Sequence, residues 1–391
     1  MRPVIPREEY DIRLEKVQNM MAELGLDLVA AYADDRFVFG QAYSRWLVDY
    51  QPKFEPALVL VPAKGEIAIA TGGESIDYIT TQSICKNAYV VSEFLHPEEE
   101  FVHVEVISMK EIIKDMEEKM GRKVTRVGVP GISTTSYSVM ESLHNMFGKD
   151  NVVDIEESMS MLRAVKTENE LEVIRYAYKI AEAGMKRVVE ILGEGITERE
   201  IAAEAEYVMR KMGSEGTGID TMVASGVEHT RPIVVMPTDR ELRRGDLVVV
   251  TLAPRYKGYH GAIARPFFIG EPSKEMLDIY NLVKTSHENT RKMLRPGIAA
   301  KDVDRVSRQL INEAGLGNHF TYTGVHSTGV IEFEIPVLSS DSKVIIEKNM
   351  VLSIDIPIFL TDCGGMRLEN GYIIKENETE SLINLDTPFV V

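Results

Sequence analysis

Short apolar runs and amphipathic stretches alternate along the first part of the chain. Leu26–Tyr32, Pro56–Pro62 and Ala88–Ser92 are apolar runs, whereas Tyr10–Leu24 carries apolar residues at every third or fourth position. Apolar runs of this length predict buried strands, and the spacing of the amphipathic stretch predicts a helix. Because strands that alternate with helices are typical of a separate α/β domain, we assign residues 1–156 to one.

After this domain the pattern changes to long helices and a hairpin that occurs twice. Leu247–Phe268 and Val351–Ile374 each contain an apolar strand, a Gly-containing reversal and a second strand. A similar helical segment precedes each hairpin, Ile191–Gly213 in the first copy and Met293–Leu316 in the second. A long pattern that occurs twice predicts two halves related by a pseudo-two-fold axis. We therefore expect an α/β (α+β) chain with a second domain over residues 157–391.

Charge and composition restrict the class of protein. The formal net charge of −17 is spread along the chain, which argues against nucleic acid or a membrane as the partner. The N-terminus has no apolar signal segment, no apolar run is long enough to span a membrane, and only two cysteines are present. These features predict a cytoplasmic protein without a disulfide framework.

A series of motifs carries a resemblance to a known family. In chain order they are LRAVKTENELEVIRYAYKIAEAGM, GEGITEREIAAEAEYVMRKMG, MVASG, LRRGDLVVV, GYHGAIARPF, LRPGIAAKDV and MRLENGYII. Together they resemble the creatinase/aminopeptidase P family, over a stretch from Met161 to Lys375. The resemblance implies a C-terminal domain with the pita-bread fold of that family, an N-terminal accessory α/β domain and a homodimer.

The resemblance also implies a set of metal-ligand positions. Peptidase members of the family bind two divalent metals through two Asp, one His and two Glu. Here the Asp positions hold Thr251 and Ala262, the His position holds His326, and the Glu positions hold Asp355 and Glu369. Because a two-metal site needs several carboxylates to neutralise its charge, we expect no metal and no other cofactor.

Two further histidines of the family are replaced, by Val234 and Phe333. His229 lies near the first of these positions but out of register, and the alternative for it is a loop histidine that faces solvent. His326 is therefore the predicted catalytic acid or base, since an imidazole suits proton transfer near neutral pH. The alternative for His326 is a structural histidine with satisfied hydrogen bonds.

The remaining acidic residues would need a partner in a site without metal. Buried carboxylates are unfavourable unless a cation lies beside them, and a guanidinium can pair with a carboxylate through two hydrogen bonds. We predict that Asp355 and Glu369 bind a cationic group of the substrate; the alternative is internal pairing with an arginine such as Arg367. The predicted substrate-binding residues are Asp355, Glu369, Arg367, His260, Thr251, His229 and Arg45.

Two other segments are interpreted from their pattern alone. Arg45 belongs to the aromatic and basic stretch Arg36–Trp46, which is expected to be irregular and to contribute to the dimer; the alternative is pairing at the surface or between the domains. Glu332 and Glu334 alternate with apolar residues and are interpreted as a solvated strand face.

Three functions fit these observations. The favoured one is a metal-independent, creatinase-like hydrolase that cleaves a C–N bond in a small cationic substrate of the guanidino or amidine type. The second is a catalytically silent pita-bread domain that binds a short peptide or small molecule. The third and least favoured is a metal-dependent Xaa-Pro peptidase, because two ligand positions are lost.

Overall fold

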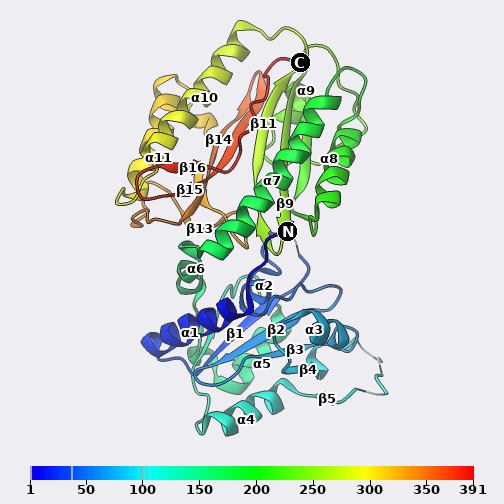
Figure 1. Cartoon of the computed structure of the whole chain (residues 1–391), viewed down its shortest axis with the longest axis vertical. Coiled ribbons are helices and arrows are strands. Elements are labelled where there is room, and N and C mark those ends of the chain that lie inside the picture. Colours follow the sequence, from blue (N-terminus) through cyan, green and yellow to red (C-terminus); the bar gives the residue numbers. More distant parts are fainter. Residues whose placement is uncertain (1, 37, 97, 99, 103) are drawn as a thin grey trace. The chain divides into compact units, whose positions relative to one another are not determined.

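The computed structural model describes residues 2–36, 38–96, 98, 100–102 and 104–391, and the chain divides into two compact units (Figure 1). One unit comprises Ile5–Arg163, and the other comprises Ala164–Val391 together with the residues up to Val4. The division falls at the end of helix α6 (Glu156–Ala164). Among the described residues, none of the helices combines the length and apolar character that a membrane crossing requires.

The N-terminal unit is built on a mixed sheet with the strand order β5-β4-β3-β2-β1-β6-β7. Its strands are β1 (Leu28–Ala33), β2 (Ala57–Pro62), β3 (Ala68–Thr71), β4 (Ala88–Val91), β5 (Val106–Ile107), β6 (Val127–Val129) and β7 (Val152–Asp154). Its helices are α1 (Arg7–Leu24), α2 (Ala42–Val48), α3 (Ile76–Gln82), α4 (Met109–Met120) and α5 (Tyr137–Phe147), with short 3-10 turns at Ser92–Phe94 and Lys149–Asn151. Apolar side chains of α4 and α5 pack with the strands into one core.

Helix α2 corrects the expectation of an irregular stretch at Arg36–Trp46, of which Phe37 lies outside the described residues. Trp46 is buried in the N-terminal unit, and the guanidinium carbon of Arg13 lies 5.4 Å from the centre of its ring. Arg45 is also buried and forms an ion pair with Asp49 at 3.1 Å. Both side chains therefore have partners within their own unit, whereas Phe39 and Arg36 of the same stretch are exposed, and its role in a dimer stays a prediction.

The C-terminal unit contains a larger sheet with the order β10-β9-β11-β15-β14-β12-β13, to which β8 and β16 are added beside β9 and β15. Its strands are β8 (Thr217–Ser225), β9 (Leu247–Tyr256), β10 (Tyr259–His260), β11 (Ile263–Phe268), β12 (Val325–Ser327), β13 (Glu334–Val337), β14 (Val351–Thr361), β15 (Gly364–Ile374) and β16 (Thr379–Ser381). Its helices are α7 (Glu168–Ile191), α8 (Glu198–Met212), α9 (Gly226–Thr230), α10 (Lys274–Met293) and α11 (Ala300–Glu313), with a 3-10 turn at Gly317–His319.

The helices of this unit begin where the sequence provides caps. The side chains of Thr167 and Thr197 each accept a hydrogen bond from the backbone N–H of the glutamate three residues later, and the side chain of that glutamate accepts one from the threonine N–H. Such capping boxes satisfy two N–H groups that a helix leaves free at its start. They fix the starts of α7 and α8, which belong to the half that contains β9 and β11.

The two predicted hairpins lie next to each other at the centre of the sheet. β9 pairs with β11, β14 pairs with β15, and β11 joins β15. The register places Thr251 opposite Ala264, Ala264 opposite Glu369, and Glu369 opposite Asp355. Directly opposed residues of paired strands project from the same face. One row across four strands therefore has carboxylates in one half and only small side chains in the other.

Candidate functional site

His326 lies in β12 with its side chain 2% exposed. Its Nδ1 donates a hydrogen bond of 3.0 Å to the backbone oxygen of Ser327, so Nδ1 carries the proton and Nε2 presents a lone pair. The ring stacks on Phe333 at 4.2 Å, which fixes its plane. Burial lowers the pKa of His326 to about 4, so the imidazole is neutral at neutral pH. The residue thus offers a fixed neutral acceptor.

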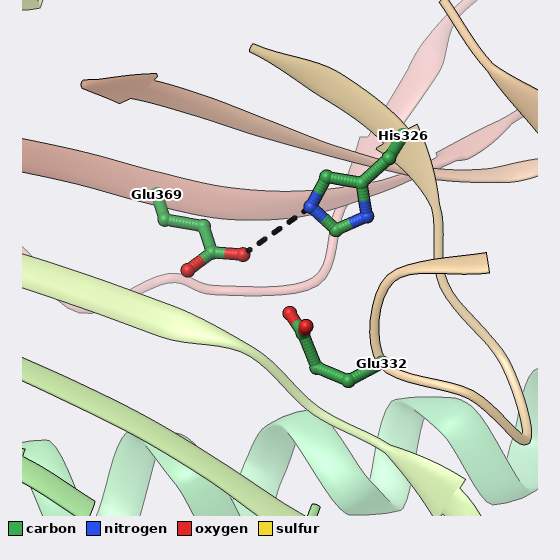
Figure 2. A group of neighbouring side chains, drawn as sticks. All are labelled: His326, Glu332 and Glu369. Carbon is green, nitrogen blue, oxygen red and sulfur yellow. Dashed lines mark ion pairs between the residues drawn. The ribbon is translucent and has the colours of Figure 1, made fainter. Parts of the chain in front are cut away.

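Two carboxylates converge on this nitrogen (Figure 2). Oε1 of Glu369, from β15, lies 3.9 Å from Nε2 of His326 and accepts a 2.8 Å hydrogen bond from Oγ of Ser353. Glu332 reaches the same point from the segment between β12 and β13. One ligand atom from each of His326, Glu332 and Glu369 lies within 4.8 Å of the other two, and all three residues are buried.

Burial disfavours a negative charge on Glu332 and on Glu369. Burial raises the pKa of Glu332 to about 7, and the positive charge of Arg367 opposes that rise. The pKa of Glu369 is raised well above its usual value, first by burial and then by the charges of Asp355 and Glu332. Two buried carboxylates that face the lone pair of an imidazole are stable only when a proton or another cation lies among the three groups. The arrangement suits one divalent metal ion, for which imidazole and carboxylate are ordinary ligands.

Asp355 is directed to other partners, although it lies opposite Glu369 in the sheet. Its Oδ2 accepts a hydrogen bond from the hydroxyl of Tyr322 and lies 3.4 Å from Nε of Arg367. The Arg367 guanidinium also lies over the rings of Tyr322 and Phe359, at 5.6 and 5.5 Å. An internal arginine therefore occupies the place beside Asp355 where a substrate cation was expected.

The residues do not fit the two-metal site of the family. Thr251 and Ala262 are both buried at positions where carboxylates would be needed, and Asp355 is paired with Arg367. The remaining group, His326, Glu332 and Glu369, fits a single divalent ion held by three protein ligands. Thr251 instead lines a small pocket with Arg367 and several apolar side chains.

Two predicted histidines lie in other surroundings. Nδ1 of His229 donates to the buried carboxylate of Glu198 at 2.8 Å, where α8 begins, and the side chain is 27% exposed. His260 is fully buried; its Nδ1 lies 3.0 Å from the backbone oxygen of Gly329, and its Nε2 has no hydrogen-bond partner within the described part of the chain. Neither belongs to the group around His326, and their predicted substrate-binding roles find no support there.

The buried imidazole of His260 makes fold stability depend on pH. Burial, and then the charge of Arg255, lower the pKa of His260 from 6.5 to about 3. Between these values the unfolded chain binds a proton that the folded chain does not, so stability falls as pH decreases through this window. Over pH 7 to 5 this one residue should lower the free energy of unfolding by about 2 kcal/mol.

Urea unfolding at pH 7 and pH 5 measures this effect. His260→Asn keeps a donor near the Nδ1 position but cannot titrate. The variant should therefore lose about 2 kcal/mol less than wild type between the two pH values, because the imidazole term is absent. An equal loss in the two proteins would show that His260 is not a neutral buried group.

Several residues of the site were not found from the sequence. Glu332 was interpreted as part of a solvated strand face, yet it is 5% exposed and lies in a loop. Tyr322 and Ser353, which hold Asp355 and Glu369, were not considered. Glu332 precedes Phe333, which stands where the family has a histidine, and this neighbouring position could have indicated that Glu332 belongs to the site.

Comparisons with known protein sequences identify a family and several relatives. Residues 172–376 match metallopeptidase family M24. An Xaa-Pro dipeptidase from Pyrococcus furiosus is 32% identical over 256 residues, which cover 66% of this chain and 73% of the relative. The uncharacterized peptidase YqhT from Bacillus subtilis is 27% identical over 389 residues, covering 97% of this chain and 100% of the relative.

Solved structures extend the likeness over almost the whole chain. An X-Pro aminopeptidase from Thermotoga maritima superimposes with a TM-score of 0.80 at 25% identity and covers 97% of this chain and 99% of its own. An Xaa-Pro dipeptidase from Bacillus anthracis gives a TM-score of 0.81 at 21% identity, with coverage of 98% and 100%. The predicted α/β fold with its pita-bread domain is therefore confirmed.

The same comparisons overturn the favoured function. The family is one of metallopeptidases and the relatives are named Xaa-Pro dipeptidases, so the metal-independent, creatinase-like cleavage of a guanidino or amidine substrate is wrong. The geometry supplies a physical reason, because Arg367 already lies beside Asp355. With its match over residues 172–376 and its likeness to the dipeptidase of Pyrococcus furiosus, this chain belongs to metallopeptidase family M24.

Proposed function

We propose that this chain hydrolyses the peptide bond before proline in a dipeptide or short peptide. One divalent metal ion, rather than two, would be held by His326, Glu332 and Glu369. The observation that carries the proposal is the convergence of these three ligand atoms within 4.8 Å in a buried site of the M24 fold. The names of the Xaa-Pro dipeptidase relatives support the choice of substrate.

The chain holds the ligand atoms in place before a metal binds. The carbonyl of Ser327 and the ring of Phe333 fix the imidazole so that Nε2 faces inward, and Ser353 orients one oxygen of Glu369. Such supporting contacts set the tautomer and direction of a metal ligand. A divalent ion at this position supplies Lewis acidity toward a carbonyl oxygen and makes a water molecule more acidic.

The overall reaction consumes one water molecule. The water oxygen forms a bond to the carbonyl carbon, the carbon–nitrogen bond breaks, and the hydrogen goes to the leaving proline nitrogen. Burial of the three ligand residues excludes other water and strengthens electrostatic contacts with the reacting group.

A narrow and mostly apolar recess lies in the same unit, with Thr251 and Arg367 in its lining. It has a volume of about 10 Å³, room for about one water molecule, and is lined by Met222, Ala224, Thr230, Pro232, Ile233, Val235, Val249, Thr251, Phe359 and Arg367. Arg367, its one charged lining residue, lies 3.4 Å from Asp355. The recess is far smaller than a ligand pocket of about 300–1,000 Å³, so the choice of an Xaa-Pro substrate rests on the named relatives.

Hydrolysis of Xaa-Pro dipeptides and tripeptides by chelator-treated protein, with Mn²⁺, Co²⁺ or Zn²⁺ added back, tests the proposal. We expect activity that returns with a single equivalent of metal, and a loss of at least about 100-fold in His326→Ala, because a first ligand contributes more than the supporting residues around it. His144→Ala in the N-terminal unit is the control. Absence of peptide hydrolysis with every metal would contradict the proposed function.

We also infer a homodimer, on the family resemblance alone. Of the stretch that was expected to contribute to it, Trp46 is buried and Phe39 is exposed. We infer that the ligand is a short peptide, which replaces the small cationic compound predicted from the sequence.

A further inference from the structure

The backbone and the side chain of His260 both bind one carbonyl in the loop after β12. The backbone N–H and the Nδ1 of His260 donate to the carbonyl oxygen of Gly329, at 2.9 and 3.0 Å. Among the residues that the structure describes, Gly329 is the only hydrogen-bond partner of this fully buried ring. Burying an imidazole is unfavourable unless its polar atoms are used, so this contact stabilises the ring in its place.

The loop between β12 and β13, residues 328–333, carries two parts of the metal-ligand site. Glu332 points toward His326 (Figure 2), and Phe333 stacks on the His326 ring. Within the loop, Oγ1 of Thr328 donates a hydrogen bond of 3.1 Å to the carbonyl oxygen of Glu332. A segment outside regular strand pairing depends on such contacts to hold a ligand in position.

Glycines allow the close packing on both sides of this contact. A Cβ on Gly218, in β8, would overlap the ring of His260, and a Cβ on Gly261 would overlap the backbone of α7. On the side of the loop, a Cβ on Gly329 would overlap Oε1 of Glu334. Because both partners are closely packed, the position of the imidazole determines the position of the loop backbone.

His260 belongs to the half of the repeat whose family ligand positions hold Thr251 and Ala262, whereas the loop belongs to the other half. We propose that His260 is a positioning residue. By binding the carbonyl of Gly329, it keeps the loop in the conformation in which Glu332 faces His326. This inference rests on the proposed function, because it concerns how the single metal ion is held. One half thus supports a ligand that the other half provides.

Replacing His260 with leucine tests the inference, because it removes the ring donor and keeps a side chain of similar size. We expect Mn²⁺ to bind about tenfold more weakly, since residues that support a ligand change metal affinity by about 10- to 100-fold. In the metal-free protein, the backbone amides of residues 328–333 should exchange about 5- to 10-fold faster, the effect of one lost hydrogen bond. Titration calorimetry and hydrogen–deuterium exchange measure the two quantities. His260→Asn keeps a donor near the Nδ1 position and should restore both.

Two further variants separate positioning from general stability. Gly218→Ala keeps the imidazole, but its Cβ would meet the ring, so it should displace the donor and also weaken Mn²⁺ binding. His287→Leu is the matched control, since His287 is another buried histidine of this unit, in α10. It should lower the melting temperature without changing Mn²⁺ affinity or exchange in the loop. Should His260→Leu fail to fold, the difference between Gly218→Ala and His260→Asn decides.

The outcomes distinguish this inference from the proposed function. Equal Mn²⁺ affinity in wild type, His260→Leu and Gly218→Ala would overturn the inference, and so would unchanged exchange in the loop or an equal loss of affinity in His287→Leu. A wild type that binds no Mn²⁺ would overturn both. A wild type that binds Mn²⁺ more tightly than His260→Leu, yet cleaves no Xaa-Pro peptide, would contradict the proposed function and leave the inference standing.

Discussion

Replacing Glu332 with glutamine should remove the metal ion and the activity together. Glutamine has nearly the same size but no charge, so one of the three ligands at the His326 site is weakened while the packing is kept. We expect metal affinity and peptide hydrolysis each to fall by more than about 100-fold, since even residues that only support a ligand change affinity by 10- to 100-fold. Titration calorimetry with Mn²⁺ measures the first, and the peptide assay the second.

The stability of the metal-free protein gives an independent measurement on the same variant. Burial and neighbouring acids disfavour charge on Glu332, so its replacement relieves a repulsion in the absence of metal. The melting temperature in chelator should therefore stay the same or rise. Glu347→Gln, an exposed position of the same unit, serves as the control. Stoichiometric metal binding in Glu332→Gln would show that the ion is held elsewhere.

Much of the C-terminal unit could be predicted, because each copy of its repeat has a local pattern of apolar residues and glycines. The strands at Leu247–Phe268 and Val351–Ile374 are apolar runs with glycine at the turns, and their pairing follows from that pattern. Helix α2 was missed, since its residues are buried by tertiary contacts that a stretch of mixed polar and aromatic residues does not reveal. Local pattern predicts an element when burial follows the period of that element.

The site was harder to predict, because its composition depends on which segments meet. Counting ligands at the family positions led to the expectation of a metal-free site, since Thr251 and Ala262 cannot replace aspartates. That count left out Glu332, which comes from a loop and lies beside His326 only in the folded chain. Buried acids need a cation beside them. Arg367 supplies that cation for Asp355, and a metal ion would supply it for Glu332 and Glu369.

Breaking the buried ion pair between Lys166 and Glu334 should cause the largest loss of stability. Lys166 donates to Oε1 of Glu334 at 2.8 Å and to Oγ of Ser327 at 3.0 Å, and both side chains of the ion pair are 1% exposed. Lys166→Met would remove the ammonium group from this ion pair. Removing one member of a buried pair typically costs about 3–5 kcal/mol, because the remaining charge is desolvated and uncompensated.

Urea unfolding followed by circular dichroism measures this loss, and the double variant identifies its cause. If the cost arises from the remaining charge, Lys166→Met combined with Glu334→Gln should recover most of the lost free energy, since a neutral amide is far less costly to bury than an unpaired carboxylate. A double variant that is as unstable as the sum of the two single variants would instead mean that each residue contributes separately.

Because Ser327 contacts Lys166 and its carbonyl fixes His326, the single variant should also weaken metal binding. The double variant should restore stability without fully restoring metal affinity, because the contact to Ser327 is still absent.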